Sequence, residues 1–443
     1  MMILQLGGKL YKMSNETNEK KPYIHRDKVN YKTPPSDTFC IIPWLHLHHW
    51  PNGNVYQCCI TSNKNIMGNL KDTTMKEIWN GDYMKQLRLD LLAGKKHGSC
   101  TKCFEQEDNN IRSFRKNANW TFDHHLHDKA KLTNKDGSVD EMQLHYWDMR
   151  FSNLCNMKCR MCGGHLSSMW HEDEKKLYSK TAEKQAIVNV KDHSQEDLKK
   201  LIDEQIPYVE EVYFAGGEPL IMDEHYYILE KLIEHGRSDV KLRYNTNLLK
   251  LRYKKWDTTE LWSKFSFVQV MASIDDLYHR AEYVRKGTRF DAIERNIDEL
   301  LQYQDVVQLN MSPTIQLLTV YNLPEYINWM LEKGLHHERL HLGNVLTSPD
   351  WYHVNTMPND LKKRVDEKLW NHHSTLTGVV ADRIELFYKS VNSYLWTEPP
   401  RHRKKGIHSD FLRLTKRLDE IRGEDFLKTF PELKDHYYRT DLE

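Results

Sequence analysis

The cysteines constrain this chain more than any other feature of its sequence. Eight occur in 443 residues, they are grouped at short intervals, and none follows Cys162. A chain of this length can bury a large core without disulfide support, and closely spaced cysteines in a large chain favour metal ligation over a disulfide framework. We therefore expect cysteine-bound metal sites in the first part of the chain. The cysteines are Cys40, Cys58, Cys59, Cys100, Cys103, Cys155, Cys159 and Cys162.

Charge and hydropathy exclude some classes of partner. Lysine and arginine number 64 against 63 aspartates and glutamates, so the chain lacks the cationic excess on which non-specific nucleic-acid binding depends. Mean hydropathy is −0.75, and we find no apolar stretch of membrane-spanning length and no secretory signal core. We therefore expect a soluble, cytoplasmic protein that binds neither a membrane nor a broad nucleic-acid surface.

The order of sequence patterns predicts five segments. A polar arm comes first, followed by a small cysteine-bearing unit, a polar linker, a long region in which strands and helices alternate, and a charged helical end. Alternating strands and helices predict an α/β fold with a parallel sheet, either open or curled toward a barrel. The predicted boundaries are 1–37 for the flexible arm, 38–110 for the small α+β unit, 111–143 for the linker, 144–350 for the α/β region and 351–443 for the C-terminal helical subdomain.

Periodicity places the individual elements. In the small unit we expect a β-hairpin, on which the alternation of histidine and leucine around His46 and His48 predicts an exposed polar face, and then one helix over 75–92. In the α/β region the predicted strands are 144–151, 209–214, 240–244, 265–274, 306–316 and 339–346. The predicted helices between them are 165–179, 195–205, 224–235, 290–303 and 323–332.

Three cysteines follow the first strand of the α/β region in a Cys-x3-Cys-x2-Cys pattern, at Cys155, Cys159 and Cys162. Three thiolates leave one coordination position open, and an open position is where a metal centre binds substrate or cofactor. A zinc site closed by His165 is the alternative from ligand spacing.

These residues resemble the radical S-adenosylmethionine (SAM) superfamily, whose signature is a three-cysteine loop after the first strand of a partial (β/α)6 barrel. The resemblance covers roughly 144–346. It implies that Cys155, Cys159 and Cys162 bind a [4Fe-4S] cluster that cleaves SAM to methionine and a 5′-deoxyadenosyl radical. It also implies SAM contacts at the ends of later strands, with Glu218 accepting the ammonium group and Arg285 pairing with the carboxylate. The expected SAM-binding residues are Gly216, Gly217, Glu218, Asn247, Ser273, Asp275 and Arg285.

The second cysteine group supplies four thiolates from the small unit, at Cys40, Cys58, Cys100 and Cys103. Four ligands suit a closed [4Fe-4S] cluster and a structural zinc ion equally well. The spacing resembles the twitch domain, the shortened SPASM domain that binds an auxiliary cluster in many radical SAM enzymes. The domain precedes the core here, as in a group of radical SAM proteins of which several are carried by phages. Cys59 is expected to be a spare side chain, with a ligand exchange between Cys58 and Cys59 as the alternative.

The resulting hypothesis is a radical SAM enzyme with two [4Fe-4S] clusters that modifies a substrate, by analogy a peptide, and receives electrons from flavodoxin or ferredoxin. The sequence does not identify the residue that reacts with the substrate. Two alternatives remain: a non-catalytic zinc or iron–sulfur interaction protein, and an RNA-modifying radical enzyme that uses the basic run 401–405. The histidines of 124–127 lie in the predicted linker, where we expect only adventitious metal binding.

Overall fold

The computed structural model describes residues 32–108, 112–341, 344–398 and 406–438, together with the short strands β1 (Gln5–Leu6) and β2 (Lys9–Leu10). Most of the predicted arm over 1–37 and the whole basic run 401–405 lie outside the described residues. The two predictions that depend on those segments are therefore not addressed by the fold.

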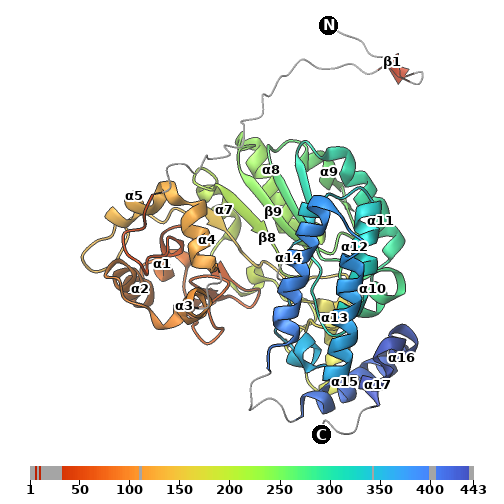
Figure 1. The fold of residues 1–443 in the computed structure, drawn as a ribbon. Helices are drawn as coiled ribbons and strands as arrows, with labels where there is room; N and C mark the ends of the chain where they lie inside the picture. Colours follow the sequence, from red (N-terminus) through yellow and green to blue (C-terminus); the bar gives the residue numbers. More distant parts are fainter. Residues whose placement is uncertain are drawn as a thin grey trace.

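A five-stranded parallel sheet forms the centre of the molecule, with the strand order β14-β12-β9-β8-β6. Helices α8 (Asp223–Glu234), α11 (Phe290–Leu300) and α12 (Leu323–Glu332) cover one of its faces (Figure 1). Alternation along the strands separates the two faces, because Leu242 and Tyr244 are buried whereas Arg243 is half-buried. We call the face that carries Arg243 the inner face. The strands are β6 (Tyr146–Trp147), β8 (Glu211–Phe214), β9 (Lys241–Thr246), β12 (Val268–Ala272) and β14 (Val307–Met311).

Both edges of the sheet differ from the predicted strands. The first strand is shorter than 144–151, because Met149 forms a parallel bridge with His49 of the N-terminal unit instead of pairing with β8. At the other edge, the described part of 339–346 contributes only two single bridges, Met311 with Leu340 and Ile315 with Val345. The predicted sixth strand is therefore wrong as a continuous strand.

The N-terminal unit is an antiparallel sheet of β3 (His48–His49), β4 (Asn54–Tyr56) and β5 (Gly68–Asn69), followed by helices. The predicted helix over 75–92 is two helices, α1 (Met75–Trp79) and α2 (Asp82–Leu92), with Gly81 in extended conformation as the N-cap of the second. The chain then forms α3 (Thr101–Asp108), α4 (Phe114–Thr121) and α5 (Leu126–Lys131). The predicted linker is thus largely helical, since Ala118, Phe122 and Leu126 recur every four residues and are buried together.

The hairpin histidines are buried at the junction with the central sheet, which corrects the prediction of an exposed polar face. His46, His48 and His49 expose 2% of their surface or less. Nδ1 of His46 lies 2.9 Å from the carbonyl oxygen of Tyr146, and Nδ1 of His48 lies 2.7 Å from that of Asp148. Burial lowers the pKa of His46 to about 4, so its ring is neutral and can donate one N–H to this carbonyl. The histidines therefore attach the N-terminal unit to the first strand.

The chain after 351 is helical wherever it is described. Helices α13 (Asn359–His373) and α14 (Gly378–Leu395) pack against each other, and α15 (Ile407–Arg422) packs against α6 (His171–Tyr178), just beyond the three-cysteine loop. Two short helices, α16 (Phe426–Thr429) and α17 (Lys434–Tyr437), follow near the C-terminus (Figure 1). Among the helices that the structure describes, none combines the length and the apolar character needed to cross a membrane.

Candidate iron–sulfur and SAM site

The three-cysteine loop lies at the carboxyl ends of the parallel strands. It leaves β6 and contains β7 (Lys158–Cys159), which pairs antiparallel with β13 (Arg285–Lys286). This register sets Cys159 opposite Arg285. A second contact fixes the loop: the indole N–H of Trp170 donates to the carbonyl oxygen of Cys159 at 2.8 Å. Cys159 and Arg285 are 126 residues apart in the sequence, but the pairing of β7 with β13 makes them neighbours.

The thiols of Cys155, Cys159 and Cys162 are close enough to influence one another. Burial raises the pKa of Cys155, and the neighbouring Cys159 raises it further. Burial also raises the pKa of Cys162 to about 12, again with a contribution from Cys159. Buried thiols held together in this way are poor acids until a metal centre replaces their protons. An N–H of Arg285 points at the Cys159 sulfur at 3.5 Å, and the buried amide nitrogen of Asn156 has no hydrogen-bond partner in the described part of the chain. The loop therefore suits a negatively charged, sulfur-bound group.

The Gly-Gly-Glu segment packs directly against this loop. Gly217 has φ +43°, and a β-carbon there would lie 2.3 Å from the carbonyl oxygen of Leu154, so only glycine allows the approach. The backbone N–H of Glu218 donates to the same oxygen at 2.8 Å. The predicted glycines therefore serve to bring Glu218 next to the cysteine loop.

The Glu218 carboxylate is buried and already bonded to the protein. It accepts from the hydroxyl of Thr246 at 2.7 Å and from the backbone N–H groups of Asn247 at 2.8 Å and Leu220 at 3.1 Å. Burial raises its pKa, and these hydrogen bonds oppose that rise. A carboxylate has about four acceptor positions, so one remains for the predicted ammonium group of SAM.

Arg285 forms a bidentate ion pair with Asp275. Nε lies 2.8 Å from one carboxylate oxygen and Nη2 lies 2.9 Å from the other, while Asp275 also accepts from the backbone N–H of Thr314 at 2.8 Å. We predicted both side chains as SAM contacts, yet each neutralises the other. Asn247 is likewise occupied, since its Nδ2 donates to Asn156 at 2.7 Å, whereas Ser273 is fixed through its backbone N–H.

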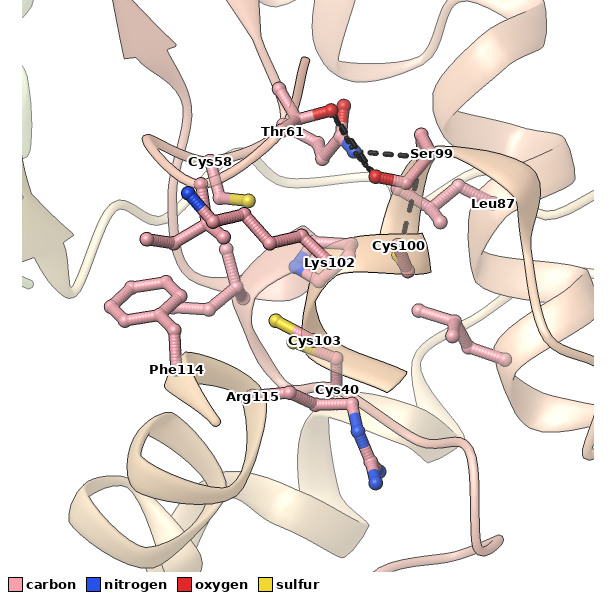
Figure 2. A pocket seen from close by; sticks show the side chains of 15 residues that line it. Cys40, Cys58, Thr61, Leu87, Ser99, Cys100, Lys102, Cys103, Phe114 and Arg115 are labelled. Atoms are coloured by element: carbon pink, nitrogen blue, oxygen red, sulfur yellow. Dashed lines mark hydrogen bonds between the residues drawn. The ribbon is translucent and has the colours of Figure 1, made fainter. Parts of the chain in front are cut away.

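The second group of cysteines lines one cavity in the N-terminal unit (Figure 2). Cys40 precedes a short 3₁₀ turn, Cys58 follows β4, and Cys100 and Cys103 lie at the start of α3. Burial raises the pKa of Cys40 and of Cys58, and the other thiols of the group raise both further. About half of the remaining lining is apolar, with Leu87 and Phe114 among these residues. The cavity therefore has the donor set of a closed, four-thiolate metal centre.

Cys58 lines the four-cysteine cavity, whereas Cys59 does not. Cys59 lines a cleft between the N-terminal unit and the inner face, together with Tyr146, Tyr213 and Arg243. Burial raises its pKa, and the nearby Asp148 raises it further. The chain turns at Cys59, just after β4, and the pair is divided between the cavity and the cleft.

The cleft contains polar residues that sequence reasoning missed. Arg243 donates to Gln269 at 3.1 Å and to Glu211 at 2.9 Å, and Gln269 donates to Gln308 at 3.0 Å. These residues form a polar row across β8, β9, β12 and β14. In the sequence, the alternation of Lys241, Arg243 and Asn245 with Leu242 and Tyr244 could have indicated a polar face on this strand.

The C-terminal helices brace the cysteine loop through buried charges, which sequence reasoning also missed. Arg160, between two of the cysteines, has a fully buried side chain that pairs with Asp419 and, at 2.6 Å, with Glu424. Its guanidinium lies over the ring of Tyr283 at 3.7 Å. No local pattern around Asp419 or Glu424 distinguishes them from surface charges, so only the packing of α15 reveals the contact.

Two family models match the chain. The radical SAM superfamily model covers 149–314, and a model described as an iron–sulfur cluster-binding domain, SPASM, covers 40–104. The matched ranges contain the three-cysteine loop and the four-cysteine cavity respectively.

Several solved structures are similar to parts of the chain, whereas no curated protein matches it. Native anSMEcpe with bound AdoMet and Cp18Cys peptide shares 17% identity over 50% of this chain and 58% of its own, with a TM-score of 0.33. Streptococcus suis SuiB bound to S-adenosylmethionine shares 16% identity over 66% of this chain and 62% of its own, with a TM-score of 0.33. This chain thus spans less than two thirds of the length of either structure.

The fold and the two cysteine sites define an α/β iron–sulfur protein. The family models identify it further: the chain contains a radical SAM domain over 149–314 and an N-terminal SPASM-like domain over 40–104, and the cofactors that these domains imply are SAM and iron–sulfur clusters. This confirms the predicted family, its enzymatic nature and its cofactors, and it sets aside the alternative of a non-catalytic interaction protein.

Proposed function

We propose that this enzyme cleaves SAM reductively at the loop of Cys155, Cys159 and Cys162 and uses the resulting radical to modify a peptide. The observation that carries the proposal is the convergence of three thiols, the Glu218 carboxylate and the Arg285 guanidinium at one end of the parallel strands. When bound there, a [4Fe-4S] cluster and SAM would supply a 5′-deoxyadenosyl radical.

The protein's own residues prepare this site in three ways. Gly217 brings Glu218 to the loop, and Glu218 keeps one acceptor position for the ammonium group of SAM. Arg285 places a cation beside the Cys159 sulfur, where it stabilises added negative charge. Asp275 holds Arg285 in position through both carboxylate oxygens, and we assign it this role in place of a direct contact with the ribose.

We further propose that Cys40, Cys58, Cys100 and Cys103 bind an auxiliary [4Fe-4S] cluster and that Cys59 is not a ligand. The support is that the four thiols share one cavity, whereas Cys59 lines the cleft beside Asp148. The auxiliary site and the cleft are both built from the segment around β4, so this cluster would lie on the substrate side of the N-terminal unit.

A peptide suits the cleft between the N-terminal unit and the inner face. The cleft has a volume of about 460 Å³, which lies within the range of ligand-binding sites. The amides of Gln269 and Gln308 offer both donors and acceptors, as a peptide backbone requires, and Trp120 and Tyr213 supply aromatic surface. Arg112, Lys241 and Arg243 outweigh the single negative charge of Glu211, which pairs with the latter two, and the resulting positive charge favours a peptide that carries acidic groups.

Four finer predictions belong to the same proposal. The first is a partial (β/α)6 barrel, which the parallel sheet and the bridges at Leu340 and Val345 support. Cytoplasmic location agrees with eight free thiols, since that compartment keeps cysteines reduced. A flavodoxin or ferredoxin would be the electron donor. The five segments predicted above, with boundaries at 37, 110, 143 and 350, stay as a proposal for the domain organisation.

Anaerobic reconstitution tests the SAM chemistry. The wild-type protein should contain about eight irons, as expected of two cubane clusters, and release 5′-deoxyadenosine from SAM after reduction. Replacing Cys155, Cys159 and Cys162 together by alanine should abolish this release and remove about half of the iron. Cleavage of SAM by the triple variant would refute the ligand assignment.

The auxiliary site and the substrate have separate tests. Cys58→Ala should lose the auxiliary iron, whereas the adjacent Cys59→Ala should keep it; equal iron in both variants would refute the assignment. For the substrate, peptides incubated with the reconstituted enzyme should show a mass change that depends on SAM and weakens in Arg243→Leu. Modification of RNA in place of peptides under the same conditions would overturn the peptide proposal.

A further inference from the structure

Four side chains from distant parts of the chain meet at the end of the sheet opposite the cysteine loop. His124 and His125 lie in the 3₁₀ turn between α4 and α5, His145 directly precedes β6, and Glu210 directly precedes β8. The three imidazoles surround the Glu210 carboxylate at 2.8 Å, 2.5 Å and 3.1 Å respectively. We call this group the His–Glu cluster.

The cluster is compact enough for one metal ion. The ligand atoms of His124, His125 and Glu210 all lie within 4.8 Å of one another. The ring centroids of His124 and His125 are 4.0 Å apart, and those of His125 and His145 are 4.2 Å apart. A tetrahedral zinc ion with bonds of about 2.1 Å separates its ligand atoms by about 3.4 Å. Small side-chain rotations would therefore bring His124, His125 and Glu210 to coordination distance of one ion. His145 contacts this group through Nδ1, which lies 3.1 Å from the Glu210 carboxylate, and it would have to move further to become the fourth ligand.

Two buried imidazole nitrogens of the cluster lack a hydrogen-bond partner in the described part of the chain. They are Nδ1 of His124 and Nε2 of His145. With Nε2 of His124 bound to a metal, Nδ1 would carry the proton and could donate to Asp123, whose carboxylate now lies 3.8 Å away. A carboxylate behind a ligating histidine is the usual outer partner in zinc sites. A ring flip of His145 would likewise direct its unpartnered nitrogen to the ion.

We propose that His124, His125, His145 and Glu210 bind one divalent transition-metal ion, with zinc as the best match for three imidazoles and a carboxylate. Four protein ligands close the site, which makes the role structural. The ion would fasten the turn between α4 and α5 to the starts of β6 and β8, and so fix the N-terminal SPASM-like domain on the α/β domain. The site lies at the opposite ends of the strands from the SAM-binding loops and is independent of radical chemistry.

Metal analysis tests the proposal on the full, anaerobically reconstituted protein. After incubation with Zn²⁺ and dialysis, the protein should retain one zinc per chain in addition to its iron. X-ray absorption at the zinc edge should show only nitrogen and oxygen ligands, which separates this site from both cysteine sites. Zinc with sulfur ligands, or no retained zinc, would overturn the proposal.

Variants locate the ion. His125→Ala and Glu210→Gln should each weaken zinc binding by more than the ~10- to 100-fold that loss of an outer partner costs, with the iron content unchanged. Glu210→Gln keeps the size and one acceptor of the side chain, so it tests ligation even where the alanine variant misfolds. His127→Ala, in the same segment but outside the cluster, is the control and should bind zinc like the wild type. Equal zinc affinity in all three variants would contradict the assignment.

Discussion

The ion pair between Asp275 and Arg285 should be among the most costly to break in this protein. The Asp275 side chain is fully buried and that of Arg285 is 14% exposed. Asp275→Asn removes the counter-charge and one of the two bidentate contacts but leaves the guanidinium in place. An uncompensated buried charge typically costs about 3 to 5 kcal/mol, and we expect a loss of that size in the free energy of unfolding.

Urea denaturation of the full chain measures this loss. The double variant Asp275→Asn/Arg285→Met should recover much of the stability, because it removes the unpaired charge as well. Asp291→Asn is the matched control, since its pair with Arg295 is about two-thirds exposed on both sides and should contribute little. The reasoning fails if Asp275→Asn costs no more than the control, or if the double variant loses the full sum of the two single losses.

Two further changes test buried charges near the site. Burial raises the pKa of Asp276 to about 7, so the folded chain holds a proton that the unfolded chain has released, and stability falls as pH rises from about 4 to about 7. Between pH 5 and pH 8 this titration should cost the wild type about 2 to 3 kcal/mol of unfolding free energy, and Asp276→Asn should abolish that cost. Urea denaturation midpoints at both pH values measure it. An unchanged pH dependence in the variant would contradict the prediction. Glu424→Gln removes one counter-charge of the buried Arg160, so the cysteine loop should retain iron less well, measured as the rate of iron loss to a chelator; a rate equal to that of wild type contradicts it.

Local spacing was enough to predict much of the site. The Cys-x3-Cys-x2-Cys loop and the Gly-Gly-Glu segment lie together, because each follows a strand of one parallel sheet and such strands end on the same side. Arg285 joins them from β13, which pairs with β7 of the loop. The strand and helix order in the α/β region was predictable for the same reason, since the apolar periodicity of β9 and α11 is local. The short first strand was not predictable, because His49 from another unit pairs with Met149.

Two of the wrong predictions share one physical cause. Polar residues were predicted to face solvent or to lie in a linker, although contacts with distant parts of the chain bury them. His46 and His48 read as exposed because histidine and leucine alternate, yet backbone carbonyls of the first strand satisfy them in a buried junction. The linker read as structureless because it is polar, yet one apolar residue per turn was sufficient to bury α4 and α5 against the rest of the unit.

The sequence by itself predicted which residues could bind a cluster and SAM, because cysteine spacing and glycine requirements act over a few residues. The tertiary structure decided which of those groups face a common site and which are already paired with another side chain. It placed Cys58 with three other thiols and Cys59 in the cleft, and it paired Arg285 with Asp275. These outcomes depend on which side chains meet across long separations, and buried charges and thiols take their chemistry from the neighbours that packing gives them.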